Sequence, residues 1–143
     1  MVFGTFDGLH PGHLNFFKQA KKLAREGELI VSVARDKNVF LIKKKYPHFN
    51  EKKRVEIIKK LAKKTKKINL IRKVILSGLK DHLPHIVKEK PDIIALGYDQ
   101  RAYVQNLKKD LKNKGILVKI VRLQPYKKNI YKNNLLKLKS GVK

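Results

Sequence analysis

The fold is decided by the stretch Gly4-Thr5-Phe6-Asp7-Gly8-Leu9-His10-Pro11-Gly12-His13. Val2 and Phe3 before it end a short apolar run, which predicts a first strand. The two glycines of the stretch permit the tight backbone with which a strand can turn into a helix. Pro11 suits the first turn of a helix, because its missing N–H would be unpaired there anyway. Apolar residues then recur at helical spacing over residues 14–24, which predicts an amphipathic helix.

His10 and His13 lie at the start of this predicted helix, just past the carboxyl end of the first strand. In an open α/β sheet, ligands bind at that edge. A helix N-terminus also offers free N–H groups and a positive dipole end, which suit a phosphate. Two histidines near a helix start are often only polar capping residues. The strand, the glycine-rich turn and the helix around them favour a phosphate site instead.

The rest of the chain alternates between strand and helix patterns. Further strands are predicted over residues 28–34, 74–76, 92–96 and 116–121. Helices are predicted after the N-cap Asn50, around residues 82–87, over residues 104–111 with Gly115 as the C-cap, and over residues 131–139, with a loop over residues 37–49. We therefore predict an α/β fold: a Rossmann-like, doubly wound, five-stranded parallel sheet with helices on both faces. Residues 1–143 are expected to form one domain.

The net charge of +25 is the most unusual property of the composition. Such a charge suggests polyanionic partners, including nucleic acid or an anionic membrane. The other interpretation is a lysine-rich composition spread over solvated faces. We favour it, because the lysines are scattered among helices and arginine, the usual reader of bases, is scarce. We do not expect nucleic acid as a partner, although the charge permits it.

Several classes of protein and site are excluded by what the sequence lacks. The chain has no cysteine, which excludes disulfides, thiolate metal sites and cysteine nucleophiles. No apolar run approaches the ~18 residues of a membrane span, and the start does not resemble a signal peptide. We therefore expect a cytoplasmic enzyme or binding protein without a membrane partner. The phosphate-binding patterns GxxxxGK[ST] and GxGxxG are both absent, so nucleotide phosphates must be held in another way.

The candidate polar residues follow the carboxyl ends of the predicted strands, where they should converge on one edge of the sheet. They comprise the stretch Thr5 to His13, Arg35-Asp36, and Gly97 to Gln100. A basic set after the last strand can close over the same edge; it contains Arg122, Lys127, Lys128 and Lys132. Histidines, lysines and a helix start suit phosphoryl or nucleotidyl transfer. In that chemistry the protein mostly positions the reactants and stabilises charge on the transferred group.

Each candidate residue can be given a role in such a site. His10 and His13 would contact the α-phosphate while negative charge builds on it, and lysines would stabilise the leaving pyrophosphate. The candidate phosphate contacts are Lys43, Arg122 and Lys132, although the run that contains Lys43 would also serve as ordinary loop charge. Asp7 or Asp99 could help to hold Mg²⁺, which needs only one or two carboxylates. Zinc is not expected, because the two histidines lack a third ligand. The remaining histidines (His48, His82 and His85) are expected at the surface or in packing.

The stretch from Gly4 to His13 resembles the GTFD…HxGH signature of the nucleotidylyltransferase superfamily, in its cytidylyltransferase-like branch. The likeness runs along nearly the whole chain. Ala34-Arg35-Asp36 is similar to the end of the second strand in this superfamily, and Asn50-Glu51-Lys52-Lys53-Arg54 to its arginine-bearing helix start. The run Pro91-Asp92-Ile93-Ile94-Ala95-Leu96-Gly97-Tyr98-Asp99-Gln100 resembles archaeal FAD synthases, as do Pro125-Tyr126 and Ile130-Tyr131-Lys132.

This resemblance implies an FMN adenylyltransferase, which transfers AMP from ATP to FMN and releases FAD and pyrophosphate. It also implies a divalent metal, expected to be Mg²⁺, and a homodimer as the default assembly. Carried over by motif, the ATP contacts are Thr5, Phe6, His10, Pro11, Gly12 and His13, with further nucleotide contacts from Asp99 and Tyr126.

The sequence departs from the superfamily at its last motif. Tyr131-Lys132-Asn133-Asn134 stands where a Ser or Thr pair usually donates to the triphosphate. An asparagine amide can also donate, but it is bulkier. Two alternatives stay open. One is a cytidylyltransferase that acts on a polyol phosphate such as glycerol 3-phosphate. The other is a basic nucleic-acid-binding module on a decayed enzyme scaffold.

Overall fold

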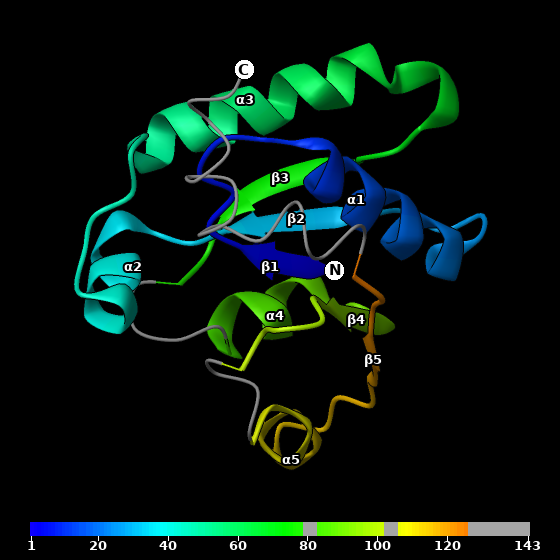
Figure 1. Cartoon of the computed structure of the whole chain (residues 1–143). Helices are drawn as coiled ribbons and strands as arrows, with labels where there is room; N and C mark the ends of the chain where they lie inside the picture. The colour runs from blue at the N-terminus through cyan, green and yellow to red at the C-terminus, as the bar shows by residue number, and fades with distance from the viewer. Residues whose placement is uncertain (79–82, 102–105, 126–143) are drawn as a thin grey trace.

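The computed structural model describes residues 1–78, 83–101 and 106–125. Its centre is a five-stranded sheet in the order β3-β2-β1-β4-β5, and every neighbouring pair is parallel (Figure 1). The strands are β1 (Val2–Gly4), β2 (Ile30–Val33), β3 (Lys73–Leu76), β4 (Ile93–Leu96) and β5 (Lys119–Arg122). The predicted five-stranded parallel sheet is confirmed.

Helices cover both faces of this sheet (Figure 1). They are α1 (Pro11–Ala24), α2 (Asp36–Lys43), α3 (Glu51–Lys64), α4 (Leu83–Glu89) and α5 (Leu107–Asn113), with a short 3₁₀ helix η1 (Lys66–Ile68). One apolar cluster contains Phe17 from α1 and Ile58 from α3. A second contains Ile86 from α4 and Leu111 from α5. The doubly wound arrangement expected from the alternation of strands and helices is therefore correct.

The central strand β1 contributes to both clusters. Val2 packs in the first cluster and its neighbour Phe3 in the second, because successive side chains of a strand point to opposite faces. The strand order also reverses beside β1, since β2 and β3 lie on one side of it and β4 and β5 on the other. Ligands of such sheets bind outside the carboxyl ends of the strands at this reversal. The loops after β1 and β4 therefore flank the expected site.

The helix boundaries agree with several of the sequence signals. The Asn50 side chain caps α3 by accepting from the backbone N–H of Lys53 at 2.8 Å. Gly115 lies just past the end of α5 with φ +78°, a conformation that favours glycine. Among the other histidines, His48 is exposed, whereas the ring of His85 lies 2.9 Å from the Ser32 hydroxyl and accepts from the N–H of Gly78.

Two expectations from the sequence are wrong. Residues 37–49 are not all loop, because α2 occupies their first half. The helical period was hidden because α2 buries only Asn38 and Val39, while the next three residues are exposed and apolar. The last strand begins at Lys119 rather than at Ile116, since pairing with β4 starts there and Ile116 packs in the connection before it. The helix expected over residues 131–139 lies outside the described residues.

Within the ranges that the structure describes, no helix combines the length and the apolar character that crossing a membrane requires.

Candidate active site

The start of α1 is built by its two histidines. His10 is the N-cap residue, and its Nδ1 accepts the backbone N–H of Gly12 at 3.0 Å. His13 Nδ1 in turn accepts the backbone N–H of His10 at 3.3 Å. This reciprocal pair is a capping box in which histidines replace the usual Ser or Thr and Glu or Gln. The two rings therefore lie together, with centroids 3.9 Å apart and planes inclined by 30°.

These capping bonds determine the tautomer of both rings. A neutral imidazole accepts on one nitrogen and donates from the other. Because Nδ1 accepts in both histidines, Nε2 carries the proton in both. Burial lowers the pKa of His10, and burial together with the neighbouring His10 lowers the pKa of His13 to about 4. At neutral pH the site thus holds two uncharged rings, each with an Nε2–H donor.

Phe6 supports the two histidines by packing against His13. Its backbone has φ +53°, which is uncommon for a bulky residue, and its side chain is only 5% exposed. The ring packs edge-on against His13 with 5.7 Å between centroids, and lies 5.2 Å from Phe17. A Cβ on Gly4 would lie 2.6 Å from the tip of the Phe6 ring, so glycine is required there. The Phe6 side chain is therefore a core residue, which leaves its backbone as the part of Phe6 that can contact a nucleotide.

Asp7 and Thr5 tie the first loop to other segments. The two carboxylate oxygens of Asp7 accept the backbone N–H groups of His48 and Phe49 at 2.6 and 2.8 Å. The Thr5 hydroxyl oxygen lies 3.5 Å from the Lys43 ammonium at the end of α2. The structure thus brings Lys43 to the predicted site, although 38 residues separate it from Thr5.

Arg54 joins the segments that frame the site, although no chemical role was predicted for it. Its side chain is fully buried and donates to the carbonyl oxygens of Thr5 and Ala34, both at 2.8 Å. It also donates to the carbonyl of Phe49 at 2.9 Å and pairs with the Asp36 carboxylate at 2.6 Å. One guanidinium therefore connects the carboxyl ends of β1 and β2 with the starts of α2 and α3.

The turn after β4 is tied to β1. Gln100 accepts the backbone N–H of Gly97 and donates to the carbonyl of Phe3, both at 2.9 Å. Arg122 donates to the carbonyl oxygens of Gly97 and Gln100 at 2.8 Å, so this predicted phosphate contact also holds the turn in place. Asp99 is exposed on the same turn. The loops predicted to converge after β1 and β4 do so.

The family of the chain follows from comparison with known proteins. The cytidylyltransferase-like family model matches residues 1–136. The chain belongs to the cytidylyltransferase-like family. The resemblance of its Gly4–His13 stretch to that family is thereby confirmed, as is the assignment to the nucleotidyltransferase enzymes.

Three curated relatives are FAD synthases of archaea. The chain is 44% identical to that of Korarchaeum cryptofilum (strain OPF8), over 86% of this chain and 79% of the relative. It is 42% identical to that of Methanothermus fervidus, over 90% and 84%. It is 45% identical to that of Methanosarcina mazei, over 86% and 74%. The crystal structure of the lipopolysaccharide core biosynthesis protein from Thermoplasma volcanium GSS1 has a TM-score of 0.76 and 38% identity, over 88% of this chain and 95% of that one.

Part of the predicted site of this cytidylyltransferase-like chain lies outside the described residues, namely Tyr126, Lys127, Lys128 and Lys132. The chain just before them is held by α1. The Gln19 amide donates to the carbonyl of Gln124 at 2.9 Å and accepts the backbone N–H of Gln124 at 3.1 Å. This pairing holds Gln124, which precedes Tyr126 closely in the sequence, beside α1.

The two carboxylates predicted to hold Mg²⁺ differ in their surroundings. Both oxygens of Asp7 accept backbone N–H groups, whereas Asp99 is exposed beside the reversal of strand order. In the described part of the chain, no three His, Cys, Asp or Glu residues group closely enough to bind a metal. Mg²⁺ keeps several waters and is usually bound by one or two carboxylates plus substrate phosphates. The exposed carboxylate of Asp99 is accessible to such an ion, whereas both oxygens of Asp7 are already engaged by backbone N–H groups.

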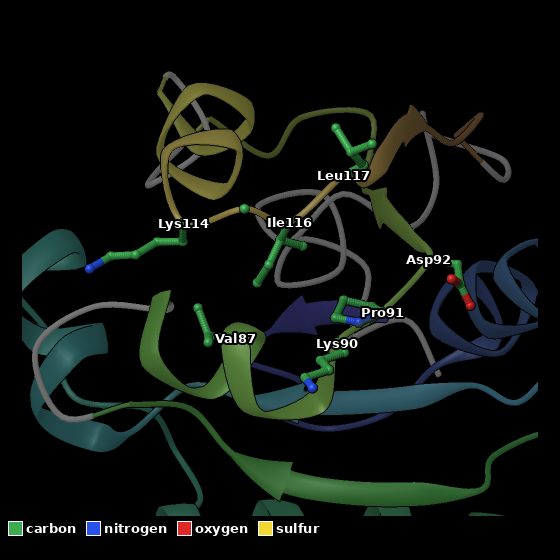
Figure 2. Close-up of a pocket in the computed structure, with 8 residues that line it drawn as sticks. Val87, Lys90, Pro91, Asp92, Lys114, Ile116 and Leu117 are labelled. Atoms are coloured by element: carbon green, nitrogen blue, oxygen red, sulfur yellow. The ribbon is translucent and has the colours of Figure 1, made fainter.

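A cavity of about 430 Å³ lies elsewhere (Figure 2). Its lining comes from the end of α4, the start of β4 and the connection from α5 to β5, and includes Val87, Pro91, Ile116 and Leu117. In a parallel sheet the amino ends of the strands lie opposite their carboxyl ends, so this cavity is remote from the histidines. None of the predicted site residues lines it.

Proposed function

We propose that this chain is an FMN adenylyltransferase, which transfers AMP from ATP to FMN and releases FAD and pyrophosphate. The observation that carries the proposal is the pair of neutral imidazoles at the start of α1, fixed as Nε2–H donors at the carboxyl edge of the sheet. The choice of ATP and FMN is supported by the FAD synthase relatives, which are 41–45% identical over most of the chain.

In this reaction an oxygen of the FMN phosphate attacks the α-phosphorus of ATP. A new phosphorus–oxygen bond forms there, and the bond from the α-phosphorus to the oxygen that bridges to the β-phosphate breaks. The electron pair of that bond leaves with pyrophosphate. No side chain has to act as a nucleophile, and the phosphate nucleophile is already ionised. The protein's contribution is to position the reactants and to stabilise the transferring group.

The two histidines supply the charge stabilisation. His10 and His13 donate from Nε2 to the non-bridging oxygens of the α-phosphate, and this interaction strengthens as negative charge builds there. Because both rings are already neutral, neither has to gain or lose a proton before it can donate. The positive dipole end of α1 acts on the same phosphate.

Charged residues from other segments act on the phosphates of the substrates. Lys43, which reaches Thr5 from the end of α2, neutralises phosphate charge beside the first loop. A bound Mg²⁺ would be held by Asp99 together with the triphosphate, and would neutralise the charge of the leaving pyrophosphate.

The reaction is tested by supplying matched pairs of substrates with MgCl₂ and measuring pyrophosphate release. The pairs are FMN with ATP, FMN with CTP, and glycerol 3-phosphate with CTP, and FAD is identified by chromatography. Release is expected only with FMN and ATP. Release only with glycerol 3-phosphate and CTP would instead identify a cytidylyltransferase. Salt-dependent binding to duplex DNA or RNA without any turnover would favour the nucleic-acid-binding alternative.

A further inference from the structure

An exposed apolar patch lies beside the candidate active site. Six large hydrophobic residues are exposed among the described residues, and four of them lie between positions 40 and 46. Two of the four are aromatic: Phe40 is 38% exposed and Tyr46 is 62% exposed. Their rings stack on each other with 4.6 Å between centroids and an angle of 23° between planes. We call this pair the aromatic shelf. A concentrated exposed patch of this kind usually marks a binding surface.

The shelf is continuous with the first loop of the site. Phe40 and Lys43 are three residues apart on α2, so their side chains leave the same face of the helix, about 5–6 Å apart at Cβ. Lys43 lies 3.5 Å from the Thr5 hydroxyl. On the other side of Tyr46, the N–H groups of His48 and Phe49 are bound by Asp7. Both flanks of the shelf are therefore attached to the loop that leads into the two histidines.

The shelf is also held in place before any ligand arrives. Lys44 ends α2 in the left-handed conformation with φ +58°, and its N–H donates to the carbonyl of Phe40 at 2.8 Å. The start of α2 is fixed by the ion pair between Asp36 and the buried Arg54. A surface that is already ordered loses less entropy when a flat ligand binds to it.

We propose that the aromatic shelf binds the isoalloxazine ring of FMN, and this proposal rests on the proposed function. FMN combines a dianionic phosphate with a flat aromatic ring system. The chain between Phe40 and Tyr46 offers the matching groups, because the lysines 43–45 lie between the two aromatic residues. With the flavin phosphate near Lys43, the ribityl chain leads away from the histidines towards the shelf. Flat rings stack favourably on exposed aromatic side chains.

The shelf would then determine which acceptor is used. A polyol phosphate such as glycerol 3-phosphate offers a phosphate for the lysines but no ring for the aromatic pair. The shelf thus adds affinity for FMN alone, while the histidines and lysines serve any phosphate acceptor.

The test measures the interaction of the full chain with FMN and with ATP separately. FMN binding is followed by quenching of flavin fluorescence and by the KM for FMN. Tyr46→Ala should weaken FMN binding about tenfold, which corresponds to about 1.4 kcal/mol, and Phe40→Ala with Tyr46→Ala should weaken it further. Tyr46→Phe keeps a ring and should stay within about twofold of the wild type. Leu117→Ala, which removes an exposed side chain at the opposite edge, should change neither FMN binding nor the KM for FMN. The KM for ATP should stay constant in every variant.

The outcomes separate the two proposals. If the wild type makes FAD but the double variant keeps its affinity for FMN, the shelf proposal is wrong while the proposed function stands. If the double variant converts a dimer into a monomer in analytical ultracentrifugation with FMN affinity unchanged, the patch is a contact between two copies, and the shelf proposal is again wrong. If the wild type neither binds FMN nor makes FAD, the proposed function is wrong, and the shelf proposal that rests on it is wrong as well.

Discussion

His10 has a capping role and a proposed catalytic role on two different atoms, and a pair of substitutions can separate them. Its Nδ1 caps α1 by accepting the N–H of Gly12, while its Nε2–H is the proposed donor to the α-phosphate. His10→Ala removes both atoms. His10→Asn removes Nε2 but keeps an acceptor oxygen at the capping position, and asparagine is among the best N-cap residues.

The two variants should therefore differ in stability but not in activity. Loss of a side-chain cap costs about 1 kcal/mol, which for a domain of this size lowers Tm by about 4 °C. We expect that loss in His10→Ala and a much smaller one in His10→Asn. Removing one transition-state donor costs about 10²-fold in kcat, or about 2.7 kcal/mol. We expect this reduction in both variants.

Thermal unfolding and pyrophosphate release from FMN and ATP measure the two effects independently. The informative combination is His10→Asn with a Tm near that of the wild type and a kcat reduced about 10²-fold. Wild-type turnover in His10→Asn would refute the reasoning, since the ring would then act only as a cap. A wild-type Tm in His10→Ala would show that the capping bonds contribute little to the start of α1.

Two further predictions concern the buried arginine and the titration of the site. Arg54→Met leaves three main-chain carbonyl oxygens without their donor and the partly exposed Asp36 carboxylate without its partner, and should lower the free energy of unfolding by about 3–5 kcal/mol in urea titrations. In the matched control, Arg72→Ala removes an exposed ion pair with Glu28 and should cost under about 0.5 kcal/mol; equal losses would contradict the assigned role of Arg54. The pKa of His13 is lowered to about 4 in the folded state, so the unfolded chain binds more protons between about pH 4 and 6.5. The free energy of unfolding should therefore fall as pH drops through this window, and less steeply in His13→Ala than in the wild type; parallel pH profiles would speak against a neutral, partly buried His13.

The sheet and the position of the candidate site in it were predictable because their signals are local. Each buried strand is a short apolar run next to turn residues, and parallel strands put their carboxyl ends at one edge. The strand, turn and helix around His10 and His13 therefore sufficed to locate the pair. The geometry that sets their tautomer was not predictable, because it depends on which backbone N–H each ring accepts.

The contacts that could not be predicted from the sequence are made to main-chain groups. Three of the four groups that Arg54 contacts are main-chain carbonyls, and every residue has one. The one local signal was its spacing, since Arg54 lies four residues before the buried Ile58 and so on the inner face of α3. Asp7 was likewise interpreted as a possible metal ligand, although its oxygens bind the N–H groups of residues 48 and 49.

The capping box explains why two histidines can serve this chemistry at the start of a helix. A donor to a developing charge must be held in one orientation and one protonation state before the reaction, since reorganising it would raise the barrier. In this chain the bonds that start α1 meet both needs, because each Nδ1 is bound by a backbone N–H and each Nε2 is thereby left with the proton. Stacking of the rings and burial against Phe6 then disfavour a charged imidazole. Folding of the helix and preparation of the two donors are thus the same event.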